Sequence, residues 1–298
     1  MFLEKIFEKL LEIGNDVYLN EKMEYHTSFR IGGPVSLFVV PNSINAFIET
    51  YKFLSGKIQV KVVGKCTNIL PKDEKMEIAV ISTERLNNID FQEDRIICES
   101  GVLLKKLCIE AMDKSLSGFE KAYGIPGSVG GAIYMNAGAY GWETAENLEY
   151  VVAFDGNKLI KLGVNELDLS YRSSIFKKRE DLIILKASFR ALKGEKEKIR
   201  DEMLDIIKKR YQKQPLEFPS AGSVFKRPKP DFYVGTAIEK LGFKGFTIGG
   251  AQVSKKHAGF IINLGDAKSK DVKEIIEIIK NKVKKEFNVD LETEIEIW

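Results

Sequence analysis

The chain has 298 residues, of which 44% are hydrophobic and 30% charged, the balance of a soluble globular protein large enough for two or three domains. Its 46 basic and 43 acidic residues are interspersed and leave a net charge of +3, which argues against a nucleic-acid partner and leaves any anionic ligand to a local site. Three cysteines without a CxxC pair, and only two histidines, argue against a zinc site or a disulfide framework, so reduced thiols are expected.

Residues 1–14 predict an amphipathic helix, because Leu3, Ile6, Phe7, Leu10 and Leu11 recur at helical spacing among charged residues. A membrane span needs about 20 apolar residues in a row, and a secretory signal needs an uninterrupted apolar core. Neither pattern occurs in the sequence. We therefore expect a cytoplasmic protein with no membrane partner.

The segment up to residue 77 predicts a small α/β unit. An apolar strand, SLFVV, ends at Pro41, and Ser43 can cap a helix whose apolar residues share one face. The stretch VKVVG then predicts a second strand. From residue 78 to 193, short β-branched segments around one helix near Leu103 and a glycine-rich stretch at 124–141 predict a larger mixed domain.

A third domain is expected over residues 194–298. It opens with a charged helix that Pro215 ends, and a second helix follows Ser269. A final strand over 291–298 alternates Leu291, Ile295 and Ile297 with acidic neighbours. No internal repeat is present.

Two segments, residues 62–70 and 123–141, are rich in glycine and in small polar side chains. Glycine lets backbone N–H groups approach an anion closely, so such loops can hold a pyrophosphate. Neither segment has the G-x-G-x-x-G spacing, which disfavours a nicotinamide-binding Rossmann domain. For either loop alone, a tight turn without a ligand is at least as good an interpretation.

Seven segments together resemble the UDP-N-acetylenolpyruvoylglucosamine reductase family, occur in the family's order and span nearly the whole chain. They are FRIGGP at 29–34, VVGKCTNIL at 62–70, GIPGSVGGAIYMNAGAYG at 124–141, SYRSSIF at 170–176, PSAGSVFKRP at 219–228, IGGAQVSKKHAGFIIN at 248–263 and LETEIEI at 291–297. The lack of a long insertion after Tyr171 resembles the shorter, type II branch of that family.

The resemblance implies an α+β flavoprotein of three domains. Two FAD-binding subdomains, 1–77 and 78–193, would hold FAD non-covalently in the manner of the vanillyl-alcohol-oxidase (PCMH) type, and residues 194–298 would bind a UDP-sugar. The implied activity is the reduction of UDP-N-acetylglucosamine enolpyruvate to UDP-N-acetylmuramate, with NADPH as reductant, in peptidoglycan precursor synthesis. We expect a monomer.

The resemblance also places FAD on the two glycine-rich loops. The first loop reads GKCTN where the family has the glycine-richer GxGSN, so Lys65 and Cys66 are expected near the cofactor. The expected cofactor-binding residues are Gly64, Lys65, Cys66, Thr67, Asn68, Ile69, Gly124, Pro126, Gly127, Ser128, Gly131 and Ala132.

Reduction of an enolpyruvyl group needs a hydride donor, a group that stabilises negative charge, and a proton donor. No side chain donates hydride, so the flavin fills that role. The resemblance assigns the proton donor to Ser223, the partner of the substrate carboxylate to Arg172, and the catalytic carboxylate to Glu294. Near a substrate carboxylate, Glu294 would act in its protonated form or anchor Arg172, so burial should raise its pKa. Glu292 lies on the same face and is the rival for this role.

Taken alone, these three residues have simpler interpretations: Ser223 as a turn hydroxyl, Arg172 as a surface cation and Glu294 as a solvent-facing strand residue. Charged or polar groups can bind the substrate's diphosphate and sugar. The candidates for substrate binding are Tyr171, Lys213, Lys226, Arg227 and His257. Each of them could equally be an exposed side chain or, in the case of His257, a histidine whose hydrogen bonds are satisfied at a strand edge.

Two other functions compete with this prediction. One is another FAD-dependent oxidoreductase of the same fold, such as a sugar oxidase, which the motifs AGSVFK and HAGFIIN disfavour. The other is a nucleotide-binding protein that has lost its chemistry, which the joint presence of Arg172, Ser223 and Glu294 disfavours.

Overall fold

The computed structural model describes residues 2–298, and the chain divides into two compact units. Unit 1 comprises the chain up to Asn20, Ser36–Lys65 and Glu77–Lys208. Unit 2 comprises Glu21–Val35, Cys66–Met76 and Lys209–Trp298. Each unit is therefore built from separate stretches of sequence, and the three-domain division at residues 77 and 193 stays a prediction.

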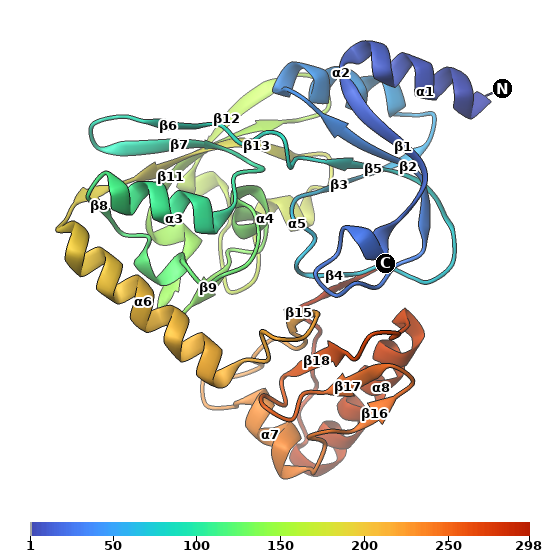
Figure 1. The fold of residues 1–298 in the computed structure, drawn as a ribbon, viewed down its shortest axis with the longest axis vertical. Coiled ribbons are helices and arrows are strands. Elements are labelled where there is room, and N and C mark those ends of the chain that lie inside the picture. The colour runs from blue at the N-terminus through green and yellow to red at the C-terminus, as the bar shows by residue number, and fades with distance from the viewer. Residues whose placement is uncertain (1) are drawn as a thin grey trace. The chain divides into compact units, whose positions relative to one another are not determined.

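A four-stranded sheet with two helices against it forms one part of unit 1 (Figure 1). The order is β1-β2-β5-β3, and β3 and β5 are parallel, so their carboxyl ends lie at the same edge. The bounds are β1 (Asn15–Lys22), β2 (Pro34–Pro41), β3 (Gln59–Val63), β5 (Met76–Ser82), α1 (Phe2–Ile13) and α2 (Ile44–Leu54).

The two helices of this part form where the sequence predicts them. Ile6 and Leu10 of α1 and Phe47 of α2 are buried in one apolar core with the sheet. The hydroxyl of Ser43 accepts the N–H of Ala46 at 3.1 Å and so caps α2, as the sequence predicted. Strand β1 was not predicted, because its sequence NDVYLNEK mixes polar and apolar residues without alternation.

The other part of unit 1 is an antiparallel five-stranded sheet of order β12-β11-β13-β7-β6. Helices α3 and α4 lie against this sheet (Figure 1), and their apolar side chains are buried with those of the sheet in one core. The strands are β6 (Ile89–Phe91), β7 (Arg95–Glu99), β11 (Leu148–Phe154), β12 (Leu159–Gly163) and β13 (Ile183–Arg190). The helices are α3 (Leu104–Asp113), α4 (Val129–Tyr134), α5 (Ile175–Lys178) and the greater part of α6 (Lys196–Lys213), whose residues from Lys209 on belong to unit 2. Two short strand pairs complete this part: β8 (Leu116–Ser117) with β14 (Leu192–Lys193), and β9 (Gly138–Ala139) with β10 (Trp142–Glu143).

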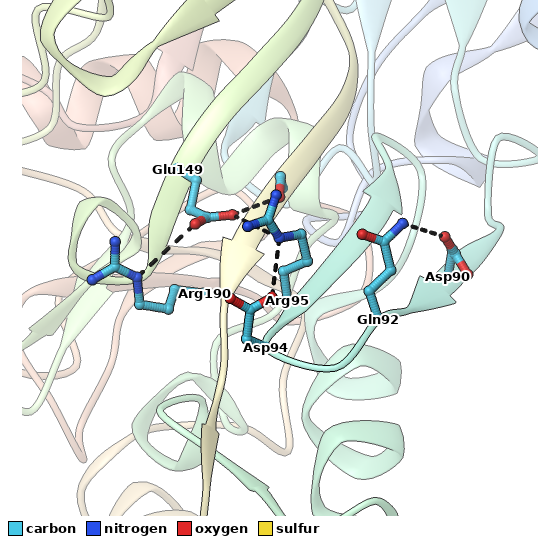
Figure 2. Close-up of polar contacts among 7 residues, drawn as sticks. Asp90, Gln92, Asp94, Arg95, Glu149 and Arg190 are labelled. Atoms are coloured by element: carbon cyan, nitrogen blue, oxygen red, sulfur yellow. Dashed lines mark hydrogen bonds and ion pairs between the residues drawn. The ribbon is translucent and has the colours of Figure 1, made fainter.

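Polar side chains on this sheet form a cluster of their own (Figure 2). Glu149 accepts a hydrogen bond from Ser188 at 2.9 Å and lies 3.8 Å from Arg95 and 3.9 Å from Arg190. These ion pairs are partly exposed, and pairs of this kind contribute at most about 1 kcal/mol. The cluster is therefore exposed at its arginine end and buried at Ser188.

Unit 2 contains a second antiparallel sheet, of order β15-β18-β17-β16, with α7 and α8 beside it. Its elements are β4 (Ile69–Leu70), β15 (Ser220–Ser223), α7 (Val234–Lys240), β16 (Thr247–Ile248), β17 (Ala251–Val253), β18 (Phe260–Asn263), α8 (Ser269–Phe287) and β19 (Glu296–Ile297). Helix α8 forms where the sequence predicts it, and Asn288 ends it in the left-handed conformation with φ of 52°.

Early segments of the chain complete the core of unit 2. Phe29, Ile31 and Leu70 are buried with Ile275 and Ile276 of α8. Asp73 accepts hydrogen bonds from the N–H groups of Ser269, at 2.8 Å, and Lys270, at 3.2 Å, at the start of α8. These contacts explain why residues 21–35 and 66–76 belong with the C-terminal part of the chain.

The predicted final strand is shorter than expected. Only Glu296–Ile297 form a strand, β19, which pairs in parallel with β4. Leu291 and Ile295 are buried as predicted, but Ile297 is 40% exposed. The reason is that this segment changes partner along its length, from residues 224–226 to residues 68–70. Across residues 2–298, no helix is long and apolar enough to cross a membrane.

Candidate active site

The two glycine-rich loops meet in unit 1 at Gly64 and Ser128. A Cβ atom at position 64 would overlap the hydroxyl oxygen of Ser128, so only glycine allows this approach. Gly127 has φ of +134°, which also favours glycine. The structure therefore brings together Gly64 and Ser128, two residues predicted to hold FAD.

A pocket of about 340 Å³ opens beside this junction, within the size range of small-molecule sites. Three of its side chains are cationic, Lys65, Arg85 and Lys106, against one carboxylate, Glu84. Cationic side chains and a closely approachable backbone both favour the binding of a diphosphate. The pocket's residues thus fit the diphosphate part of a dinucleotide, and the full lining is Gly64, Lys65, Glu84, Arg85, Asn87, Gly101, Leu103 and Lys106.

Arg85 and Lys106 were not among the predicted site residues. Arg85 follows β5 and Gly64 follows β3, and the carboxyl ends of adjacent parallel strands are where ligands of open α/β sheets bind. Arg85 pairs with Asp16 and donates to Asn42 at 2.5 Å, while Lys106 donates to the carbonyl of Asn87 at 3.1 Å. Arg85 could have been predicted as a site residue only if β3 and β5 had been recognised from the sequence as parallel neighbours.

The structure refines the second glycine-rich segment, which the sequence suggested was a loop. Residues 129–134 form helix α4, and the Ser128 hydroxyl caps it by accepting the N–H of Gly131 at 3.4 Å. Ala132 is buried in the core and Ser128 is 2% exposed. A side chain at Gly130 would come within 2.9 Å of Ser100, which explains a glycine inside a helix. Gly124 and Pro126 lie in the turn that precedes α4.

The first loop divides between the two units after Lys65. Gly64 and Lys65 belong to unit 1, whereas Cys66, Thr67, Asn68 and Ile69 belong to unit 2. Cys66 is buried and has φ of +52°, a conformation that glycine adopts more easily than cysteine. The cysteine thus replaces a glycine of the GxGSN pattern at a position where the backbone still has the geometry of glycine.

Arg172 lies at the tip of a tight turn in unit 1. Ser170 and Ser173 exchange two main-chain hydrogen bonds of 3.1 Å, which leaves Tyr171 and Arg172 as the turn residues. Arg172 has φ of +55°, a strained value for a residue with a side chain. Its guanidinium lies 5.0 Å from the ring of Tyr171, which is 47% exposed. Strain of this kind is concentrated at functional sites, so the simple interpretation as a surface cation is less favourable.

Three hydrogen bonds fix this turn to the glycine-rich segment. Arg172 donates to the carbonyl of Gly138 at 2.9 Å, and Ser174 donates to the carbonyl of Tyr134 at 2.7 Å. Asn136 donates to the carbonyl of Ser170 at 3.2 Å. The predicted partner of the substrate carboxylate is therefore held beside the segment predicted to bind FAD.

In unit 2, the C-terminal segment lies between the Ser223 segment and the first glycine-rich loop. The N–H of Glu294 donates to the carbonyl of Val224 at 2.7 Å, and the N–H of Lys226 donates to the carbonyl of Glu292 at 2.9 Å. On the other side, the side-chain amide of Asn68 donates to the carbonyl of Glu294 at 3.0 Å. The structure thus places the Ser223 and Glu294 segments on adjacent backbones.

Ser223 ends β15 at an irregular point of the sheet. The register of β15 with β18 shifts between Ser220 and Ser223, and Gly222 has φ of +79°. Such bulges redirect a side chain relative to a regular strand. Ser223 is partly buried, so it is neither a core residue nor a fully exposed turn hydroxyl.

Glu292 and Glu294 differ in their surroundings. The Glu292 side chain is 77% exposed and forms an ion pair of 3.0 Å with Lys226. Glu294 is partly buried, and both of its main-chain polar groups are hydrogen-bonded. Glu294 is thus less exposed than Glu292 and its main chain is held on both sides, which favours Glu294 for a role beside a bound substrate.

The remaining substrate-binding candidates lie in unit 2. Arg227 is exposed and lies 4.5 Å from the ring of Tyr233, while Lys213 is exposed at the end of α6. Lys226 is bound to Glu292, so an anionic ligand would compete with that carboxylate for its charge. Their part in substrate binding stays a prediction.

His257 is partly buried against glycines and an aromatic ring. Its Nδ1 accepts the N–H of Gly259 at 3.0 Å, and its ring lies 5.0 Å from that of Phe260. Burial lowers the pKa of His257, so the ring is neutral near pH 7. It can therefore offer a neutral hydrogen bond to a ligand, but not a permanent positive charge.

Comparison with known proteins agrees with this geometry. A family model described as FAD binding domain matches residues 35–157, and one described as UDP-N-acetylenolpyruvoylglucosamine reductase, C-terminal domain, matches residues 214–298. The chain is thus an α+β flavoprotein with an FAD-binding region and a C-terminal α+β part, which confirms the predicted α+β fold class.

Similar full-length proteins define the family. A UDP-N-acetylenolpyruvoylglucosamine reductase of Thermosipho melanesiensis is 59% identical, over 99% of this chain and 100% of that protein. One of Fervidobacterium nodosum is 58% identical, over 99% of this chain and 96% of that protein. The crystal structure of the enzyme of that name from Thermus caldophilus matches with a TM-score of 0.81 and 31% identity, over 95% of this chain and 98% of that one. The chain belongs to the UDP-N-acetylenolpyruvoylglucosamine reductase family.

Proposed function

We propose that this protein reduces UDP-N-acetylglucosamine enolpyruvate to UDP-N-acetylmuramate with reducing equivalents from NADPH, for peptidoglycan precursor synthesis. The observation that carries the proposal is the main-chain hydrogen bond of 2.7 Å from Glu294 to Val224, beside Ser223. It joins the two segments predicted to supply the catalytic carboxylate and the proton donor. Membership of the reductase family gives this arrangement its substrate.

The pocket beside Gly64 and Ser128 would hold the diphosphate of FAD. Lys65, Arg85 and Lys106 would supply the charge, with the ligand competing against Asp16 for Arg85 and against Glu110 for Lys106, and the glycine backbone would supply the close approach. When bound, FAD would carry the reducing equivalents that no side chain can carry. NADPH as their source follows from the resemblance of the sequence to the family.

Arg172 would bind the carboxylate of the enolpyruvyl group. A guanidinium is permanently charged and planar, and it matches a carboxylate in a bidentate arrangement. Its turn is fixed by Asn136 and Ser174, so little motion has to be restricted when the substrate binds. By holding negative charge at the carboxylate, Arg172 would favour reduction at the adjacent double bond.

Ser223 would donate a proton to the carbon next to that carboxylate, and Glu294 would act at the same group. A serine hydroxyl is a weak acid, but a carbanion-like carbon is a strong base, so a well-placed hydroxyl suffices. The feature that supports Ser223 is the bulge at Gly222. The feature that supports Glu294 is that its main-chain N–H and carbonyl are hydrogen-bonded to Val224 and Asn68.

The purified protein tests this proposal directly. We expect a yellow protein with flavin absorbance that NADPH bleaches without oxygen, and that UDP-N-acetylglucosamine enolpyruvate restores. A protein that cannot bind FAD contradicts the cofactor assignment. A flavoprotein that ignores the enolpyruvyl substrate but consumes oxygen with a sugar alone is instead an oxidase.

A further inference from the structure

The side chain of Asn68 contacts the segment that carries the proposed catalytic carboxylate. Its amide nitrogen donates to the main-chain carbonyl of Glu294 at 3.0 Å, across 226 positions of the sequence. The sequence predicted Asn68 only as a cofactor-binding residue. This contact gives it a second partner on a different part of the chain.

The hydrogen bond extends a main-chain pairing that would otherwise stop short of Glu294. Strand β4 begins at Ile69, and its parallel pairing with β19 begins at Glu296, whose N–H donates to the carbonyl of Asn68 at 2.8 Å. In a parallel pair, main-chain N–H groups bind the carbonyls of the partner strand at regular intervals. The side-chain amide of Asn68 provides such a donor at Glu294, one carbonyl beyond the paired strands.

We infer that Asn68 is a positioning residue for Glu294, an inference that rests on the proposed function. The N–H of Glu294 is held by Val224 and its carbonyl is held by Asn68, so the residue is fixed from both sides. The same loop continues from Gly64, which lines the pocket for the cofactor. Asn68 thus sets the place of the carboxylate relative to the loop, while Val224 sets it relative to Ser223.

Asp73 provides a control in the next loop of unit 2, which follows β4. It holds that loop to the start of α8, by accepting hydrogen bonds from the N–H groups of Ser269 and Lys270. Its removal breaks two hydrogen bonds to a carboxylate without touching Glu294. Asp73→Ala should therefore lower the melting temperature and leave turnover near the wild-type value.

The test variant is Asn68→Asp, which keeps the size of the side chain, removes the donor and faces an oxygen toward a carbonyl oxygen. We expect kcat with the enolpyruvyl substrate to fall about 10- to 100-fold, since small displacements of a catalytic group have effects of this order. With FAD present in excess, so that any loss of cofactor affinity is compensated, flavin reduction by NADPH and the KM for the substrate should change by less than about threefold, a difference below 1 kcal/mol. Asn68→Ser serves if Asn68→Asp does not fold.

A double-mutant cycle with Glu294→Gln shows whether Asn68 acts through Glu294. If it does, Asn68→Asp causes little further loss of kcat once Glu294 is changed, because residues that act as a unit are not additive. Additive losses, an unchanged kcat in Asn68→Asp, or an unchanged kcat in Glu294→Gln would each overturn the inference. A loss of activity that excess FAD restores would make Asn68 a cofactor residue only. Failure of the wild-type protein to turn over the substrate is a different result, which contradicts the proposed function itself.

Discussion

The backbone at Gly64 lies so close to the hydroxyl of Ser128 that any side chain at position 64 would overlap it. The contact joins two loops that are far apart in the sequence, and Gly64 forms part of the wall of the cationic pocket. A change at Gly64 should therefore affect the cofactor before it affects the rest of the fold.

Gly64→Ala should weaken FAD binding by at least about tenfold, which corresponds to about 1.4 kcal/mol. It should also lower the free energy of unfolding by about 1–3 kcal/mol, the usual effect of overpacking. Titration of the apoprotein with FAD measures the first effect and urea unfolding the second. Gly163→Ala is the control, because its Cβ would meet only one atom, at an ordinary distance of 3.6 Å. Equal FAD affinities for the two variants would remove Gly64 from the cofactor site.

Ser223→Ala should separate the two halves of the proposed reaction. Reduction of the flavin by NADPH needs no proton on the sugar, so its rate should stay near the wild-type value. Reoxidation by the enolpyruvyl substrate should slow by about 10² to 10⁴, the usual contribution of a positioned general acid. Stopped-flow absorbance follows both halves, with Ser220→Ala on the same strand as control. Slowing of both halves alike would instead indicate a structural role for Ser223.

The stability of the protein should depend on pH through His257. Burial lowers the pKa of His257 in the folded protein, so the unfolded chain binds a proton at higher pH than the folded one. The free energy of unfolding should therefore fall as the pH drops below about 6.5, the ordinary pKa of histidine. This contribution ends once the pH is below the folded pKa. In His257→Asn, which keeps an acceptor for Gly259, denaturant unfolding at several pH values should show a smaller slope. Identical slopes would mean that another group is responsible.

Two substitutions at Cys66 should differ sharply in their effect. In Cys66→Gly, the relief of the left-handed conformation, about 1–2 kcal/mol, offsets the loss of a buried side chain. In Cys66→Val, a β-branched residue is forced into the same conformation, which is a severe outlier. Thermal unfolding should place Cys66→Gly near the wild-type protein and Cys66→Val well below it. A stable Cys66→Val protein would show that the φ of this residue is not constrained.

Local signals in the sequence predicted most helices correctly. The cap at Ser43 and the spacing of apolar residues located α2, and the same spacing located α8. Helix α4 was missed because its glycines have low helix propensity. Gly130 is tolerated there because the helix packs tightly on Ser100, a contact that no local pattern reveals.

The site was predicted less from physical pattern than from resemblance. Arg172 and Ser223 are ordinary residue types for a surface or a turn, and only their motifs distinguished them. The structure adds the strained turn at Arg172 and the bulge before Ser223. Arg85 and Asn68 show what the sequence could not provide, since their roles depend on strand pairs formed by distant segments.

The discontinuity of unit 2 has a consequence for biosynthesis. Phe29, Ile31 and Leu70 leave the ribosome early, yet their apolar partners on α8 are about two hundred residues later in the chain. At ordinary elongation rates of about 5–20 residues per second, these segments wait roughly 10 to 40 seconds without their native contacts. During that interval, most of the sequence of unit 1 has been synthesised, so unit 1 can begin to fold before unit 2 is complete. The nascent chain therefore exposes these apolar segments until α8 has been synthesised.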